Sequence, residues 1–198
     1  MTTGLLLSGG MDSTAIAYWR RPKVAFTVDY GQRPAVGEVR AAAAVAAALG
    51  IAHHVIRANL SALGSGEMAG TDALAVAPVP EWWPFRNQML VTLCAMKAVS
   101  LGVNRLLIGC LATDERHADG RPGFITALDT LLQAQEGEIR LEAPAIGMTA
   151  AELVRTSGVP AEILSWSHSC HVAEYACGQC RGCRKHYETI AELGAEPY

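Results

Sequence analysis

The chain has 198 residues, of which 51% are hydrophobic and 18% are charged. This composition is typical of a compact globular protein and excludes a disordered or fibrous one. The formal net charge of −3 gives no electrostatic basis for binding nucleic acid or an anionic membrane, so tRNA is disfavoured as a partner. Neither a secretory signal nor a bilayer-spanning apolar stretch is visible, so we expect no membrane partner and a cytoplasmic location.

Apolar runs of strand length alternate with longer amphipathic segments along the chain. Strands are predicted at residues 4–7, 24–28, 54–56, 105–109 and 139–141. Helices are predicted at residues 13–20, 36–49, 87–101, 123–135, 150–158 and 184–193. Strands that alternate with helices form a parallel sheet with right-handed crossovers, so we expect an α/β fold of three layers, of the Rossmann-like type. A single domain over residues 1–198 is expected to hold all of these elements.

Two further segments carry local signals. Thr149 and Glu152 have the spacing of a capping box, which predicts that a helix begins there and ends near Gly158. Residues 61–85 hold most of the irregular sequence of the chain. A loop of this length inside a compact domain is typically functional or mobile.

A Ser/Gly-rich turn lies between the first predicted strand and the first predicted helix. Its glycines let backbone N–H groups approach an anion closely, and the helix N-terminus favours negative charge. The carboxylate of Asp12 fits beside phosphates only if a cation such as Mg²⁺ lies between them. The turn therefore predicts a Mg-nucleotide site, with an ordinary N-capped turn as the alternative. The predicted nucleotide-binding residues are Leu7, Ser8, Gly9, Gly10, Met11, Asp12, Ser13 and Thr14.

The turn differs from the two commonest glycine-rich nucleotide loops, since it has neither the Gly-x-Gly-x-x-Gly pattern nor the lysine of the Walker A motif. It resembles the Ser-Gly-Gly-x-Asp-Ser loop of the PP-loop ATP pyrophosphatases. That resemblance implies an adenine nucleotide alpha hydrolase-like fold. It also implies that the loop grips the pyrophosphate end of ATP while AMP is transferred to an oxygen of an acceptor.

Three loops are expected to meet at one edge of the predicted sheet. Ligands of parallel α/β sheets bind at the carboxyl ends of the strands. This rule places residues 8–13, 29–32 and 110–122 along one rim. The nucleotide site is therefore expected to have walls from all three loops.

Four cysteines near the end of the chain have the spacing of metal ligands. Thiolates separated by six, two and two residues suit a closed tetrahedral Zn²⁺ site, whereas an iron–sulfur cluster also uses four cysteines. Disulfides are disfavoured in the expected compartment, and clustered free thiols are the other alternative. The predicted metal ligands are Cys170, Cys177, Cys180 and Cys183, within a zinc-binding segment over residues 165–198.

The neighbours of these cysteines are given structural roles. The positive side chains of Arg181, Arg184 and Lys185 are expected to offset the charge of a Zn(Cys)₄ centre. His168 and His171 are expected to be exposed loop histidines that do not bind the metal. Four thiolates complete the coordination, so the site is expected to be structural and to contribute to folding.

The turn and the cysteine cluster together resemble the QueC family of 7-cyano-7-deazaguanine synthases. The intervening sequence agrees with this resemblance over nearly the whole chain. Residues 29–33, Asp-Tyr-Gly-Gln-Arg, are similar to the motif after that family's second strand. Arg86-Asn87 is similar to its Gly-Arg-Asn motif, and Gly109, Thr113 and Asp114 are similar to the loop near its substrate.

The resemblance implies a reaction and assigns roles to residues. QueC enzymes convert 7-carboxy-7-deazaguanine, ammonia and ATP into a nitrile through an amide, by two adenylations. The implied catalytic residues are Asp12, Ser13, Asp29 and Arg86. The implied substrate-binding residues are Tyr30, Gln32, Phe85, Arg86, Asn87, Thr113 and Asp114. Helix or turn capping remains an alternative for the last four of these, and core packing remains one for Tyr30 and Phe85. A homodimer is expected through the resemblance alone.

The sequence also departs from the family pattern near the acceptor. Phe85 replaces a glycine, and we expect that a phenylalanine does not easily adopt a positive φ and adds bulk to the site. Pro34 replaces a histidine, and residues 115–121 do not match the family loop. The alternatives are therefore a divergent paralogue that adenylates a tRNA base or conjugates a deazapurine to a protein, and a non-enzymatic nucleotide- and zinc-binding protein.

Overall fold

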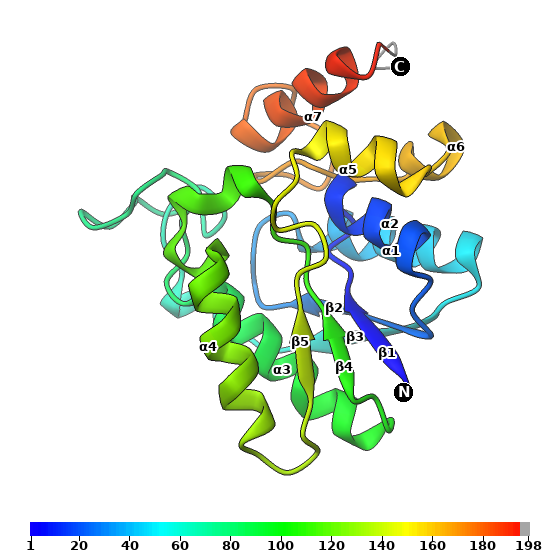
Figure 1. Ribbon diagram of the computed structural model, residues 1–198. Helices are drawn as coiled ribbons and strands as arrows, with labels where there is room; N and C mark the ends of the chain where they lie inside the picture. Colours follow the sequence, from blue (N-terminus) through cyan, green and yellow to red (C-terminus); the bar gives the residue numbers. More distant parts are fainter. Residues whose placement is uncertain (195–198) are drawn as a thin grey trace.

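The computed structural model describes residues 1–194, without the side chain of Glu115, and its centre is a five-stranded parallel sheet (Figure 1). The strand order is β3-β2-β1-β4-β5, and every neighbouring pair is parallel. The strands are β1 (Thr3–Leu6), β2 (Val24–Asp29), β3 (Ala52–Arg57), β4 (Arg105–Leu107) and β5 (Arg140–Glu142). All carboxyl ends therefore lie at one edge of the sheet. The last four residues of the predicted zinc segment lie outside the described residues.

Helices cover both faces of the sheet (Figure 1). One face is packed by α1 (Met11–Arg20), α2 (Ala35–Leu49), α5 (Ala150–Ser157) and α6 (Ala161–Leu164), and the other by α3 (Arg86–Ser100) and α4 (Pro122–Gln133). Each face has its own apolar core, with Leu5, Ile16 and Leu107 in one and Phe26, Val91 and Leu106 in the other. The expected three-layer α/β fold is confirmed.

The segment after α6 returns across the carboxyl ends of the strands. It ends in α7 (Arg181–Glu192), which lies above the sheet in Figure 1 and contacts α5. The loops hold three short 3-10 helices, η1 (Ser61–Leu63), η2 (Ala112–Arg116) and η3 (Ala118–Gly120). None of the helices in residues 1–194 has the length and apolar character needed to cross a membrane.

Local sequence signals explain where several helices begin and end. Gly50 ends α2 and Gly158 ends α5, both in the left-handed conformation that glycine adopts without strain. The capping box is confirmed: Glu152 N donates to Thr149 Oγ1 at 3.2 Å, and Thr149 N donates to Glu152 Oε2 at 2.8 Å. The helix α6 was not predicted, because its four residues after Pro160 are too few for a periodic pattern.

Candidate active site and metal centre

A cavity of about 300 Å³ lies at the carboxyl ends of the strands. All three predicted loops contribute to its wall, through the turn after β1, Tyr30 after β2, and Cys110 and Asp114 after β4. Further walls come from α2, from the loop before α3, and from the C-terminal segment. The rim expected from strand topology is therefore a real concavity, and it is enclosed by more elements than the three loops alone.

The turn after β1 is shaped to receive an anion. Gly9 has a φ of 80°, and a Cβ at this position would lie 2.6 Å from the carbonyl oxygen of Glu38, so only glycine fits. Gly10 N donates to Ser8 Oγ at 3.2 Å, and Ser13 Oγ donates to Gly10 O at 3.0 Å. Ser8, Gly10, Asp12 and Ser13 line the cavity at the N-terminus of α1. Backbone N–H groups, two hydroxyls and the helix dipole thus converge on one place.

Asp12 has a cationic partner from the other end of the chain. Lys185 on α7 places Nζ 2.9 Å from Asp12 Oδ2, and both side chains line the cavity. Burial lowers the pKa of Lys185, but the carboxylates of Asp12 and Asp114 outweigh this effect and raise it. Lys185 is therefore a fixed positive charge beside the turn, rather than a charge that faces the cysteine cluster as the sequence suggested.

Glu38 is a buried carboxyl group in the same cavity. Its Oε2 accepts a hydrogen bond from Gln32 Nε2 at 2.7 Å, and its neighbours include Arg86 and Asp29. Burial raises the pKa of Glu38 to about 7, against the lowering effects of Gln32 and Arg86. Such a group exchanges a proton near neutral pH and is suited to general acid–base chemistry.

Gln32 orients this group and does not line the cavity itself. It donates to Val28 O at 3.1 Å and accepts from Tyr30 N at 2.8 Å, in addition to its bond to Glu38. All of these bonds are internal, and the side chain is buried. The position does not support the prediction that Gln32 binds substrate.

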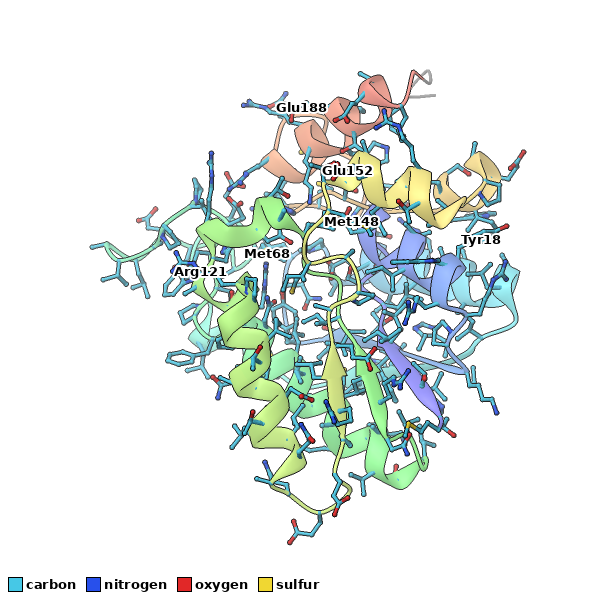
Figure 2. The ribbon with its side chains drawn as sticks, viewed as in Figure 1. Tyr18, Met68, Arg121, Met148, Glu152 and Glu188 are labelled. Atoms are coloured by element: carbon cyan, nitrogen blue, oxygen red, sulfur yellow. The ribbon has the colours of Figure 1, made fainter. Side chains whose placement is uncertain are left out.

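Arg86 and Asn87 begin α3 at the cavity, as the sequence suggested. Arg86 Nη1 lies 3.0 Å from Sδ of Met68, which Figure 2 labels in the interior of the molecule. Asn87 donates both its backbone N and its Nδ2 to Asp119 at 3.0 Å. Asp114 Oδ2 accepts from Leu111 N at 2.9 Å. Arg86 lines the cavity as a cation that already faces several acidic groups, while Asn87 and Asp114 also hold neighbouring segments in place.

Five other predicted site residues do not line the cavity, among them Gly9, whose role is to shape the turn. The side chains of Phe85 and Thr113 are exposed, whereas Thr14 is fully buried in the core. Asp29 accepts from Gly31 N at 3.3 Å and lies 4.0 Å from Arg57. The positions of these other four residues do not support direct contact with substrate or phosphate.

Phe85 differs from its expectation in a second way. It adopts the left-handed conformation, with φ of 55°, immediately before α3. Its side chain is 75% exposed, so the extra bulk points to solvent and away from the site. Phe85 therefore adopts a left-handed backbone conformation that glycine would adopt without strain. For a residue other than glycine this strain costs about 1 to 3 kcal/mol.

Several cavity residues were not expected from the sequence. Tertiary packing brings Glu38, Glu81 and Lys185 to the cavity, and no local pattern marks them. His168 and His171 were expected to be exposed, but both line the cavity. Burial lowers the pKa of His171 to about 4, so its imidazole is neutral. Both histidines lie within two positions of Cys170 in the sequence. This spacing was a signal that the cysteine cluster also holds them in place.

The cysteine cluster has the geometry of a tetrahedral metal site. The Sγ atoms of Cys170, Cys177, Cys180 and Cys183 all lie within 4.8 Å of one another. Two of the separations are 3.9 and 4.0 Å, near the roughly 3.8 Å edge of a tetrahedron with metal–sulfur bonds of about 2.3 Å. Backbone N–H groups of His171, Gln179 and Cys183 donate to these sulfurs, which suits thiolates. The donor set therefore fits a metal ion.

The cluster segment is attached directly to the nucleotide turn. His168 N donates to Gly9 O at 2.7 Å, and Arg181 Nη1 lies 2.6 Å from Glu81 Oε1. A Cβ at Gly182 would overlap the carbonyl oxygen of Ser169, so α7 can begin beside this loop only with glycine there. The cysteine cluster thus belongs to a segment whose residues also form part of the cavity wall.

Comparison with known proteins places the chain in a family. The family model described as queuosine biosynthesis protein QueC matches residues 3–194. The chain belongs to the QueC family. A QueC relative from Laribacter hongkongensis, named 7-cyano-7-deazaguanine synthase, is 34% identical over 96% of this chain and 90% of its own length. A relative of the same name from Anaeromyxobacter dehalogenans is 32% identical, over 97% of this chain and 92% of its own length.

A solved structure is also similar to this QueC family member. It is the U34-tRNA thiolase NcsA from Methanococcus maripaludis with its 4Fe–4S cluster, with a TM-score of 0.52 and 16% sequence identity. The match covers 96% of this chain and 64% of that chain. At this identity the likeness shows the fold alone.

Proposed function

We propose that the protein is a 7-cyano-7-deazaguanine synthase, which uses ATP and ammonia to convert 7-carboxy-7-deazaguanine into its nitrile. The observation that carries this proposal is the intact Ser8–Ser13 turn facing a cavity at the carboxyl ends of the strands in a member of the QueC family. The named relatives support the choice of substrate. The exposed position of the Phe85 side chain removes one reason for assigning a different acceptor.

The first step activates the substrate carboxylate. A carboxylate oxygen attacks the α-phosphorus of ATP, and pyrophosphate leaves. The N–H groups and hydroxyls of the turn hold the departing phosphates, with Lys185 as the nearest fixed positive charge. Mg²⁺, when bound, neutralises phosphate charge, and Asp12 is the carboxylate placed to hold it.

The later steps release protons that a base must accept. Ammonia attacks the acyl adenylate, AMP leaves, and one proton is lost as the amide forms. The amide oxygen is then adenylated, and loss of AMP with two N–H protons gives the nitrile. Glu38 is the proton acceptor, because it lies in the cavity and its pKa of about 7 matches the working pH. Gln32 holds it in position.

The cysteine cluster is proposed to bind zinc in a structural role. Four thiolates leave no open coordination position for substrate. When bound, the ion supplies a fixed link between the loop over residues 168–180 and α7, and so holds Lys185 and Arg181 at the cavity. Metal analysis of the purified protein, with about one zinc and no iron per chain expected, tests the choice of metal.

The proposed reaction is tested directly with purified protein. Incubation with 7-carboxy-7-deazaguanine, MgATP and ammonium is expected to yield the nitrile, two AMP and two pyrophosphate. Asp12→Ala is expected to abolish this turnover, which separates an enzyme from a protein that only binds nucleotide. If 7-carboxy-7-deazaguanine does not stimulate ATP consumption by the wild-type protein, the proposed substrate is excluded. Modification of added tRNA or of a protein instead would favour an acceptor of that class.

Lys185→Met is expected to lower kcat/KM for ATP by about 10- to 100-fold, because a charge-assisted hydrogen bond at the turn is lost. Arg184→Met is the matched control, since Arg184 is exposed on the same helix and does not line the cavity. Its effect is expected to stay within about twofold. Steady-state kinetics at varied ATP measure both, and equal effects of the two variants would contradict the role given to Lys185.

A further inference from the structure

Glu81 carries a buried oxygen atom that has no partner. Its side chain is only 6% exposed, and the residue lines the cavity. Oε1 accepts a hydrogen bond from Arg181 at 2.6 Å, whereas Oε2 is buried and makes no hydrogen bond within the described part of the chain. A buried carboxylate oxygen without a donor costs about 1 to 3 kcal/mol or more, so such an atom calls for an explanation.

The other carboxylates of the cavity are already engaged. Asp12 Oδ2 pairs with Lys185, Asp114 Oδ2 accepts from Leu111 N, and Glu38 Oε2 accepts from Gln32. The family resemblance implied that Asp114 binds substrate, but its Oδ2 holds the loop after β4. Among these four carboxylates, Glu81 alone has an oxygen that is both buried and unpartnered.

The position of Glu81 is fixed by packing. Two residues further on, Trp83 is buried and packs edge-on against Tyr30, with ring centroids 4.9 Å apart. On the other side, Glu67 N donates to Pro80 O at 2.9 Å. Arg181 supplies the balancing positive charge from α7. A carboxylate held from both sides is arranged in advance for a ligand and gains little by moving.

The ligand chemistry follows from the free atom. An ionised carboxylate only accepts hydrogen bonds, so its partner must present N–H or O–H donors. A guanine-type base has two adjacent donors, the ring N1–H and the exocyclic 2-amino group, and each carboxylate oxygen has two lone pairs. Among the described residues, His171 Nδ1 is also buried without a hydrogen-bond partner. Glu81 acts on this imidazole electrostatically, so a second polar atom lies on this side of the cavity.

We propose that Glu81 is the specificity-determining residue that accepts hydrogen bonds from N1–H and the 2-amino group of the deazaguanine base. This inference rests on the proposed function for the identity of the base. Arg181 is the positioning residue for Glu81, because it holds Oε1 and leaves Oε2 to the ligand. The loop before α3 thereby supplies base recognition that its irregular sequence did not reveal.

Calorimetric titration with two bases tests this assignment without any turnover. The wild-type protein is expected to bind 7-deazaguanine about 10- to 100-fold more tightly than 7-deazahypoxanthine, which lacks the 2-amino group. Glu81→Gln is expected to lose this preference to within about threefold, because an amide presents a donor where the base also has donors. Glu81→Asp keeps the charge but has a side chain that is shorter by one methylene group. Its preference for 7-deazaguanine is expected to lie between those of the wild-type protein and Glu81→Gln.

The matched control is Glu67→Gln. Glu67 belongs to the same loop and also carries a buried Oε2 without a partner, but it does not line the cavity. This variant is expected to keep the full preference for 7-deazaguanine. ATP affinity measured on every variant reports whether the turn is still folded, and a Glu81→Asp protein that binds ATP normally replaces Glu81→Gln should the latter not fold.

The outcomes separate the two proposals. Equal binding of both bases by the wild-type protein, or an unchanged preference in Glu81→Gln, overturns the role of Glu81 even if the nitrile is formed. A preference that depends on Glu81, in a protein that does not convert 7-carboxy-7-deazaguanine, supports base recognition and overturns the proposed reaction. A change in Glu67→Gln equal to that in Glu81→Gln overturns the assignment in favour of a general effect on the loop.

Discussion

Cys180→Ser is expected to release the metal and to lower ATP-dependent turnover by at least about 100-fold. Cys180 is the N-cap of α7, and its sulfur accepts from the backbone N–H groups of His171 and Cys183. Without a fourth ligand the cluster loses the binding free energy that holds this segment folded. Lys185 and Arg181 then leave the cavity, and the turn loses the hydrogen bond from His168 N to Gly9 O.

Metal content, circular dichroism and turnover are the measurements for this variant. Cys94→Ala is the matched control, because Cys94 is a buried thiol of the α3 core and takes no part in the cluster. It is expected to lower thermal stability while keeping one metal per chain and most of the turnover. A Cys180→Ser protein without metal that retains wild-type kcat and KM would show that the segment does not position the site.

Glu38→Gln is expected to lower the rate of nitrile formation by about 100-fold at about pH 8 and to abolish its rise with pH. In the wild-type protein the acid form predominates below pH 7 and takes up no proton, so turnover increases as pH passes through about 7. Arg86, Asp29, Tyr30 and Gln32 are the charged and polar groups that act on Glu38, and they are unchanged in the variant.

Two partial reactions distinguish a base from a structural residue. The exchange of pyrophosphate into ATP that depends on 7-carboxy-7-deazaguanine needs no proton acceptor. It is expected to persist in Glu38→Gln. Hydroxylamine is largely unprotonated at neutral pH and is expected to restore part of the second step. Glu188→Gln, an exposed change on α7 (Figure 2), is the control. Loss of pyrophosphate exchange in Glu38→Gln to the same extent as nitrile formation would contradict the role as base.

The same group predicts a pH-dependent change in stability. Because folding raises the pKa of Glu38 from 4.5 to about 7, its contribution is fully present below pH 4.5 and is lost as pH rises through 7. The glutamine in Glu38→Gln does not ionise, so this variant does not lose stability in this way. Its free energy of unfolding is therefore expected to exceed that of the wild-type protein by roughly 3 kcal/mol at about pH 8, and by little below about pH 4.5. Urea unfolding at both pH values measures the difference.

The parts of the site that sequence could predict are those with a local signature. The turn at residues 8–14 and the cysteine cluster each lie within one short segment, and backbone and sulfur geometry dictate their spacing. The parallel sheet followed from the alternation of apolar and amphipathic segments. Thr149 and Gly50 marked helix ends because capping depends on one or two residues.

The remaining parts depend on contacts between distant segments. Asp12 and Lys185 are 173 positions apart, and Glu81 and Arg181 are 100 apart, so neither pair leaves a pattern in the sequence. The family resemblance implied that Gln32 binds substrate, but the bond to Glu38 turns its amide inward. Phe85 was judged by its ordinary backbone preference, but it adopts the left-handed conformation before α3.

The bond between His168 and Gly9 has a consequence for protein synthesis. Gly9 and His168 are 159 positions apart in the sequence, so His168 and the cysteines leave the ribosome long after Gly9. Contacts of such long sequence separation form late in folding. A nascent chain that still lacks residues 168–183 therefore has a turn without this contact, and we expect it to cleave ATP only after that segment has folded. With the proposed structural role of the metal, protein made during metal shortage is expected to accumulate in an inactive form.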